Sequence, residues 1–71
     1  MRIEPNEIYE PDSMQLSLIG KPQTLARYRH EGRGPNYIKL GKKILYLGQD
    51  VLTWLEEHQV NVNKRNFYDH L

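Results

Sequence analysis

The spacing of apolar residues in the middle of the chain predicts one short helix. Pro22 suits the first position of a helix, and Leu25 and Tyr28, three residues apart, would form its buried stripe. Gly32 ends the pattern, so we expect a helix of about ten residues, or roughly 15 Å. Four polar side chains fall on or beside its opposite face, namely Gln23, Thr24, Arg27 and His30.

The next apolar positions predict a hairpin and a closing helix. The runs YIKL and ILYL flank GKK, and short runs rich in Ile, Leu and Tyr around a Gly-containing turn are typical of a β-hairpin. Asp50 is a good N-cap for VLTWLEEHQ, where an apolar face recurs at helical spacing. That stripe comprises Val51, Trp54, Leu55 and His58. We expect His58 to be a packed or interfacial side chain, not a metal ligand.

The segment before residue 22 has an ambiguous period. Met14, Leu16 and Leu18 alternate as in a strand, whereas Met14, Leu18 and Ile19 fall at helical spacing. Asp12 or Ser13 as an N-cap and Gly20 as a stop favour a helix of about two turns. Residues 1–10 and 60–71 lack a sustained period. We therefore expect a flexible arm, a single domain over residues 11–59 and a mobile tail.

Charged residues are segregated along the chain, although the net charge is only +1. Residues 1–20 carry one basic side chain against four acids (−3), residues 21–43 carry seven against one (+6), and residues 44–71 carry two against four (−2). A basic centre between acidic flanks is typical of a surface that meets phosphates. The alternative is an ordinary solvated surface.

Several classes of protein are disfavoured by the composition. Without Cys the chain has no disulfide and no thiolate metal site, and its three His residues fall on separate predicted elements. No spacing groups a nucleophile with a base and an orienting acid, so we expect no enzyme, cofactor or metal. The sequence lacks an apolar run of membrane-spanning length and a basic, apolar leader. We expect a soluble cytoplasmic protein with no membrane contact.

The run KPQTLARYRHEGRGPNYIKLGKKILY, followed by DVLTWL, resembles the small MerR-like winged helix-turn-helix domains of phage and mobile-element excisionases and AlpA-type regulators. TLARYR, EGRGP, YIKLGKKILY and the Asp-x-x-x-Trp-Leu ending are its most specific parts. The resemblance covers about residues 12–58 and implies an α+β fold of helix, turn, recognition helix, hairpin wing and closing helix. The first helix departs from the family, since it lacks a small Ala and ends in Leu18, Ile19 and Gly20.

The resemblance also implies which residues contact DNA. In the family the TL-x-x-aromatic-Arg segment is the recognition helix, which makes Gln23, Thr24, Arg27 and His30 similar to groove-facing residues and Arg29 similar to a phosphate contact. The GP-x-aromatic stretch opens the wing, so Arg33, Lys39, Lys42 and Lys43 are similar to wing and backbone contacts. Tyr46, Trp54 and Leu55 are similar to core residues.

The function implied first is that of an excisionase, a recombination directionality factor that binds and bends attachment-site DNA and assists an integrase. Several copies would bind tandem sites cooperatively. The same fold also suits a small transcriptional regulator or a terminase or replication-initiation adaptor. From another class, a protein-interaction module would use the basic face on an acidic partner. Phe67 and Tyr68 in the tail are candidate partner contacts.

Overall fold

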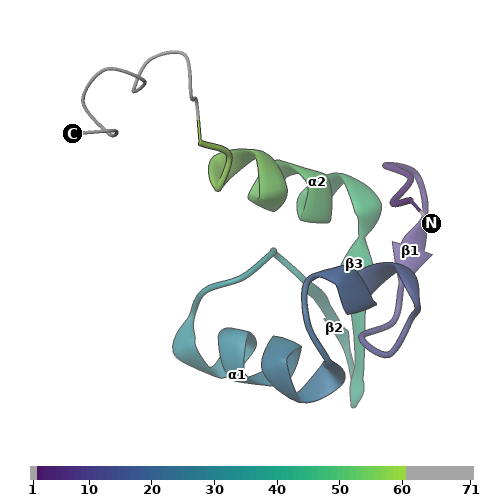
Figure 1. The fold of residues 1–71 in the computed structure, drawn as a ribbon. Helices are drawn as coiled ribbons and strands as arrows, with labels where there is room; N and C mark the ends of the chain where they lie inside the picture. The colour runs from purple at the N-terminus through teal and green to yellow at the C-terminus, as the bar shows by residue number, and fades with distance from the viewer. Residues whose placement is uncertain (1, 61–71) are drawn as a thin grey trace.

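The structure is a computed structural model that describes residues 2–60. Two α-helices, a 3-10 helix and three short strands make up this part of the chain (Figure 1). In chain order they are β1 (Ile8–Tyr9), η1 (Gln15–Leu18), α1 (Pro22–Glu31), β2 (Ile38–Leu40), β3 (Lys43–Leu47) and α2 (Gly48–Glu57). The prediction of a small α+β fold is confirmed.

The sheet is antiparallel with strand order β1-β3-β2, so β3 is the central strand. The predicted hairpin is confirmed: Leu40 pairs with Lys43, which leaves a turn of two residues, Gly41 and Lys42. Gly41 has a φ of +59°, whereas Lys42 has no positive φ. Glycine at the first turn position with this φ is the signature of a type II′ turn, whose twist matches that of the paired strands.

Helix α1 has the bounds that Pro22 and Gly32 predict. Pro22 occupies the first turn, where its missing N–H leaves no hydrogen bond unmade. Gly32 ends the helix in the left-handed conformation, with a φ of +74°. Leu25 is buried on the inner face at 1% exposure. Both ends of α1 are therefore explained by local sequence.

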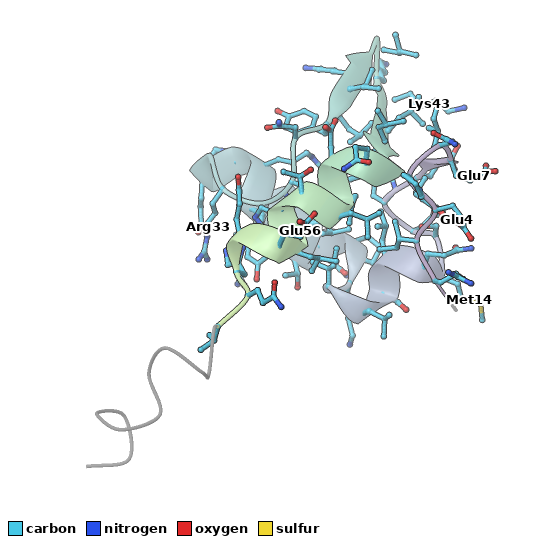
Figure 2. All side chains as sticks on the ribbon, turned by 90° about the horizontal axis from the view of Figure 1, so that it is seen from above. Glu4, Glu7, Met14, Arg33, Lys43 and Glu56 are labelled. Carbon is cyan, nitrogen blue, oxygen red and sulfur yellow. The ribbon has the colours of Figure 1, made fainter. Side chains whose placement is uncertain are left out.

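The segment before α1 is not the predicted two-turn helix. It forms a single 3-10 turn, η1, whose N-cap is Met14 without a side-chain cap hydrogen bond. Leu16 is 1% exposed, whereas Met14 and Leu18 are 72% and 73% exposed, and Figure 2 shows Met14 at the edge of the molecule. Leu16 and the partly buried Ile19 attach this short turn to the core, so each predicted apolar stripe has only one member facing the core. The helix-turn-helix arrangement therefore remains a prediction.

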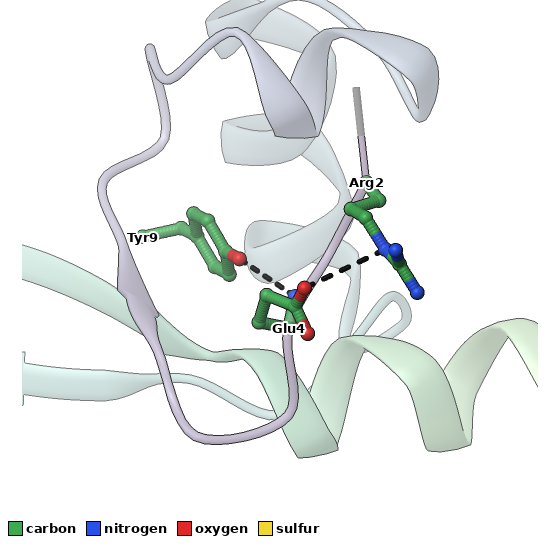
Figure 3. A network of polar contacts seen from close by, with 3 residues as sticks. All are labelled: Arg2, Glu4 and Tyr9. Carbon is green, nitrogen blue, oxygen red and sulfur yellow. Dashed lines mark hydrogen bonds and ion pairs between the residues drawn. The ribbon is translucent and has the colours of Figure 1, made fainter.

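The N-terminal arm is part of the sheet, contrary to the prediction of a loosely held segment. Ile8 pairs with Leu47 and Tyr9 with Tyr46, and Tyr9 is only 8% exposed. The Tyr9 hydroxyl accepts a hydrogen bond of 2.7 Å from the Glu4 amide (Figure 3). The ion pair of Glu4 with Arg2 is exposed and contributes little. A two-residue strand is too short to show a period, which is why sequence pattern misses it.

The same arm determines where α2 begins. The Gly48 amide donates to the Glu7 carbonyl at 2.8 Å, and the Gln49 amide donates to the Pro5 carbonyl at 3.1 Å. Main-chain carbonyls thus satisfy amides that a side-chain cap would otherwise serve. The prediction of Asp50 as N-cap is wrong: Asp50 lies in the first turn, where its charge complements the helix dipole.

The core takes one large side chain from each of five segments, namely Tyr9, Leu16, Leu25, Tyr46 and Val51. Tyr46, at 1% exposure, is confirmed as a core residue. Trp54 is only half-buried, and the prediction for Leu55 is wrong, since it is 40% exposed. Helix α2 therefore faces the core mainly through Val51. Neither helix among residues 2–60 combines the length and apolar character needed to cross a membrane.

Candidate nucleic-acid interface

Three predicted contact residues form one stripe on the outer face of α1. Gln23, Arg27 and His30 follow one another at intervals of four and three residues, and all three are exposed. At 100° per residue they cluster opposite Leu25, which anchors the helix to the core. The burial of Leu25 therefore turns these polar side chains outward.

Thr24 is placed differently. It is half-buried, and a Cβ built on Gly20 would lie 2.8 Å from the Thr24 methyl carbon. The side chain thus packs against the turn that leads into α1, beside the outer stripe. The structure does not bring Thr24 together with Gln23, Arg27 and His30.

Arg29 lies on the inner side of α1. Its guanidinium donates a 2.7 Å hydrogen bond to the Tyr46 hydroxyl and lies 5.7 and 5.9 Å from the ring centres of Tyr37 and Tyr46. The side chain is half-buried and ties α1 to the sheet. One of its five N–H donors is used in this bond, which leaves the others for a further partner.

Aromatic contacts hold the far end of α1 against α2. The ring centres of Tyr28 and Trp54 are 6.2 Å apart, and those of Trp54 and His58 are 4.4 Å apart. The His58 Nδ1 atom lies 2.8 Å from the Trp54 carbonyl oxygen. The guanidinium of Arg33 lies 4.7 Å from the centre of the Tyr28 ring. These contacts, with Leu25, position α1.

The hairpin presents Lys39, Lys42 and Lys43, all exposed. Lys43 forms an exposed ion pair of 3.5 Å with Glu10, and it lines a hollow of about 330 Å³ together with Lys42, Pro22, Glu10 and Asp12. The hairpin therefore lies beside the first residue of α1. The two acids compete with any external anion for the lysines.

Arg33 does not belong to the hairpin, although the family pattern assigns it there. It lies in the loop between α1 and β2, and its Nε atom donates to the Glu31 carboxylate at 2.7 Å. Figure 2 shows Arg33 and Lys43 at separate ends of the molecule, with Glu4 and Glu7 on the side of Lys43. The cationic groups are thus distributed around α1 and not gathered in one cluster.

The outer stripe of α1 and the basic hairpin lie on the same side of the molecule. α1 and the turn between β2 and β3 lie on one side of the molecule, and α2 lies on the other (Figure 1). The hairpin projects from the body in Figure 2, and in Figure 1 its tip reaches the level of α1. A helix and a projecting basic hairpin on one side can contact a large anionic surface together.

Sequence reasoning did not assign roles to Asn36 and Tyr37. With Arg29 and Arg33 they line a hollow of about 340 Å³ in the loop after α1. The only local signal is the GRGP sequence, whose glycines permit the backbone to turn there. Phe67 and Tyr68, the predicted partner contacts, lie outside the described residues.

Comparison with protein-family models, with curated proteins and with solved structures gives no match for this chain.

Proposed function

We propose that the protein binds double-stranded DNA as a winged helix-turn-helix protein, with α1 in the major groove. The observation that carries this proposal is the exposed stripe of Gln23, Arg27 and His30, which lies on the same side of the molecule as the basic hairpin. Both elements therefore face the same external surface.

The dimensions and chemistry of the stripe suit base recognition. A ten-residue helix is about 15 Å long, and the major groove of B-DNA is about 12 Å wide. Arg27 is suited to the O6 and N7 acceptors of guanine, and Gln23 to the donor and acceptor of adenine. These two side chains are the candidate base readers.

The hairpin suits contacts with the DNA backbone. Lys39, Lys42 and Lys43 are mobile point charges at its exposed surface, and such charges neutralise phosphates without reading sequence. The type II′ turn keeps the tip narrow. A narrow tip allows a wing to reach the DNA backbone or the minor groove. We assign to this element affinity, not specificity.

Within this class we propose an excisionase that binds and bends attachment-site DNA and assists an integrase, because the family that the sequence resembles includes such proteins. So small a domain covers a short site, which favours several copies on tandem repeats. A transcriptional regulator of the AlpA type would use the same groove contacts. The two functions differ in whether the protein increases excision by the integrase.

Binding to a 20-base-pair duplex, measured by fluorescence anisotropy, tests the proposal. If about four phosphates are neutralised, affinity falls about a hundredfold between 50 and 200 mM salt. Arg27→Ala should weaken binding to the preferred site by about 1–3 kcal/mol. The matched control is Arg2→Ala, which removes the same charge from an exposed residue of the arm. Equal effects of the two variants would contradict a specific role for α1.

An attachment-site plasmid with its integrase then separates the functions. An excisionase increases excision when added to the purified integrase, whereas a regulator leaves excision unchanged and represses a promoter. Salt-sensitive binding to an acidic protein, with no binding to any duplex, would instead indicate an interaction module with a basic face.

A further inference from the structure

A second feature of the proposed interface is the hollow in the loop after α1. Its volume is about 340 Å³, and it is lined by Arg29 of α1 and by loop residues 32–37. The loop leads from the end of α1 to β2 (Figure 1). The hollow therefore lies between the two elements that we assign to DNA.

The charge of the hollow is positive. Arg29 and Arg33 both line it, and no acidic side chain does so. Arg33 is paired with Glu31 through its Nε atom, and Arg29 is bonded to the Tyr46 hydroxyl through one terminal nitrogen. Each guanidinium has five N–H donors, so both keep donors for an anion. Glu31 neutralises only part of this charge.

The backbone of the loop adds neutral donors. Gly34 has a φ of +98°, which turns the backbone just before Pro35, a residue without an amide N–H. Within residues 2–60, the amides of Gly34 and Asn36 donate no backbone hydrogen bond to a described residue. The Asn36 side chain and the Tyr37 hydroxyl, both on exposed residues, provide further donors at the rim.

We propose that this hollow binds one phosphate group, and that its natural source is a phosphodiester of the DNA backbone. Forked guanidinium donors and free amides match the oxygens of a tetrahedral anion. A DNA strand that passes from the major groove occupied by α1 to the groove or backbone contacted by the hairpin would cross the loop between α1 and β2. This source rests on the proposed function, while the anion site itself rests on the hollow alone.

Inorganic phosphate is the first probe. In a ¹⁵N–¹H NMR titration of the full chain at constant ionic strength, the amide signals of Gly34, Asn36 and Tyr37 should shift more than that of Ile8, with a saturating curve. Asn36→Asp places a negative charge in the hollow and should weaken phosphate binding at least about tenfold. The matched control is Asn6→Asp, which makes the same change at an exposed residue of the arm.

The fluorescence of Trp54, the single tryptophan, shows whether each variant is folded. Arg33→Gln provides a second variant that adds no negative charge. Phosphate shifts spread evenly over the chain, or an Asn36→Asp variant that binds phosphate as well as Asn6→Asp, would overturn the site.

Duplex DNA is the second probe and tests the source of the phosphate. Loss of one phosphate contact in Arg33→Gln should lower the slope of log affinity against log salt by about 0.9 relative to the unchanged protein. If the loop binds phosphate but no duplex binds, the anion site stands and the proposed function fails. If the duplex binds while the loop signals and the salt slope stay unchanged, the proposed function stands and the DNA backbone is not the source of the phosphate.

Discussion

At the scale of single residues, the contact between Arg29 and Tyr46 shows how α1 is fixed to the sheet. Tyr46 is 1% exposed, and its hydroxyl is the acceptor for a charged donor 2.7 Å away. Hydrogen bonds to charged groups contribute more than neutral ones, and loss of the acceptor would leave the half-buried Arg29 guanidinium without this partner. Arg29, which the family resemblance makes similar to a phosphate contact, thus also has a structural role.

Tyr46→Phe should therefore lower the free energy of unfolding by about 1.5–3 kcal/mol, because it removes the acceptor and keeps the ring. Urea denaturation followed by Trp54 fluorescence measures this loss. The control is Tyr37→Phe, whose hydroxyl has no hydrogen-bond partner among the described residues. Equal stability of the two variants would show that the bond to Arg29 is not made in solution.

At the scale of elements, the N-terminal arm and α2 stabilise each other. The arm pairs with β3 through β1, and its carbonyls accept hydrogen bonds from the first amides of α2. The close approach depends on Gly48, because a Cβ there would lie 1.8 Å from the Glu4 carbonyl oxygen. Glycine is required at this helix start for space and not for its φ.

Gly48→Ala should displace the arm and lower the free energy of unfolding by about 1–3 kcal/mol, the usual cost of overpacking. Hydrogen exchange should then become faster at the amide of Gln49, which is bonded to the Pro5 carbonyl. The neighbouring exposed substitution Gln49→Ala is the control and should change stability by less than about 0.5 kcal/mol. A Gly48→Ala variant with unchanged stability and exchange would show that the arm is not held there.

The proposed division between α1 and the hairpin is also a prediction about elements. Replacing Gln23 and Arg27 by Ala should relax base preference, since these side chains would reach base edges. Replacing Lys42 and Lys43 by Ala should weaken binding to all sequences alike, since phosphate contacts carry no sequence information. Selection from a random duplex library measures both. If the hairpin pair changes base preference and the helix pair does not, the two roles are exchanged.

At the scale of the whole molecule, the charge segregation seen in the sequence is modified by the fold. The acidic arm does not lie far from the basic segment: Glu10 forms an ion pair with Lys43 and shares a hollow with Lys42. The hairpin that we assign to phosphate contacts is thus partly neutralised by the chain itself. Such a neighbour weakens DNA binding most at low salt, where charges are least screened.

Glu10→Gln should therefore increase the affinity for duplex DNA by about two- to fivefold at 50 mM salt, a gain of roughly 0.4–1 kcal/mol from one exposed charge. The gain should shrink at 200 mM salt. Anisotropy titrations at the two salt concentrations measure it. Glu57→Gln is the control, because it removes one carboxylate from the last residue of α2, on the other side of the molecule. The same gain in both variants would point to net charge alone.

Local signals in the sequence determined α1 and the hairpin. Pro22 and Gly32 set the ends of the helix, and Gly41 permits the tight turn between β2 and β3. Each of these features depends on the backbone preferences of one or two residues, which are the same in any context. Placing Leu25 inward was enough to turn Gln23, Arg27 and His30 outward, so the outer stripe of the candidate site was also predictable.

Only the tertiary structure decided the rest. The strand β1, the start of α2 and the inward position of Arg29 each depend on a partner distant in the chain: β3, the arm carbonyls and Tyr46. Likewise, Val51 is buried and Leu55 is exposed: the sheet lies at the start of α2, and the rest of the helix extends beyond it (Figure 1). Periodicity reports which residues can share a face, but the surface available in the folded molecule decides which of them are covered.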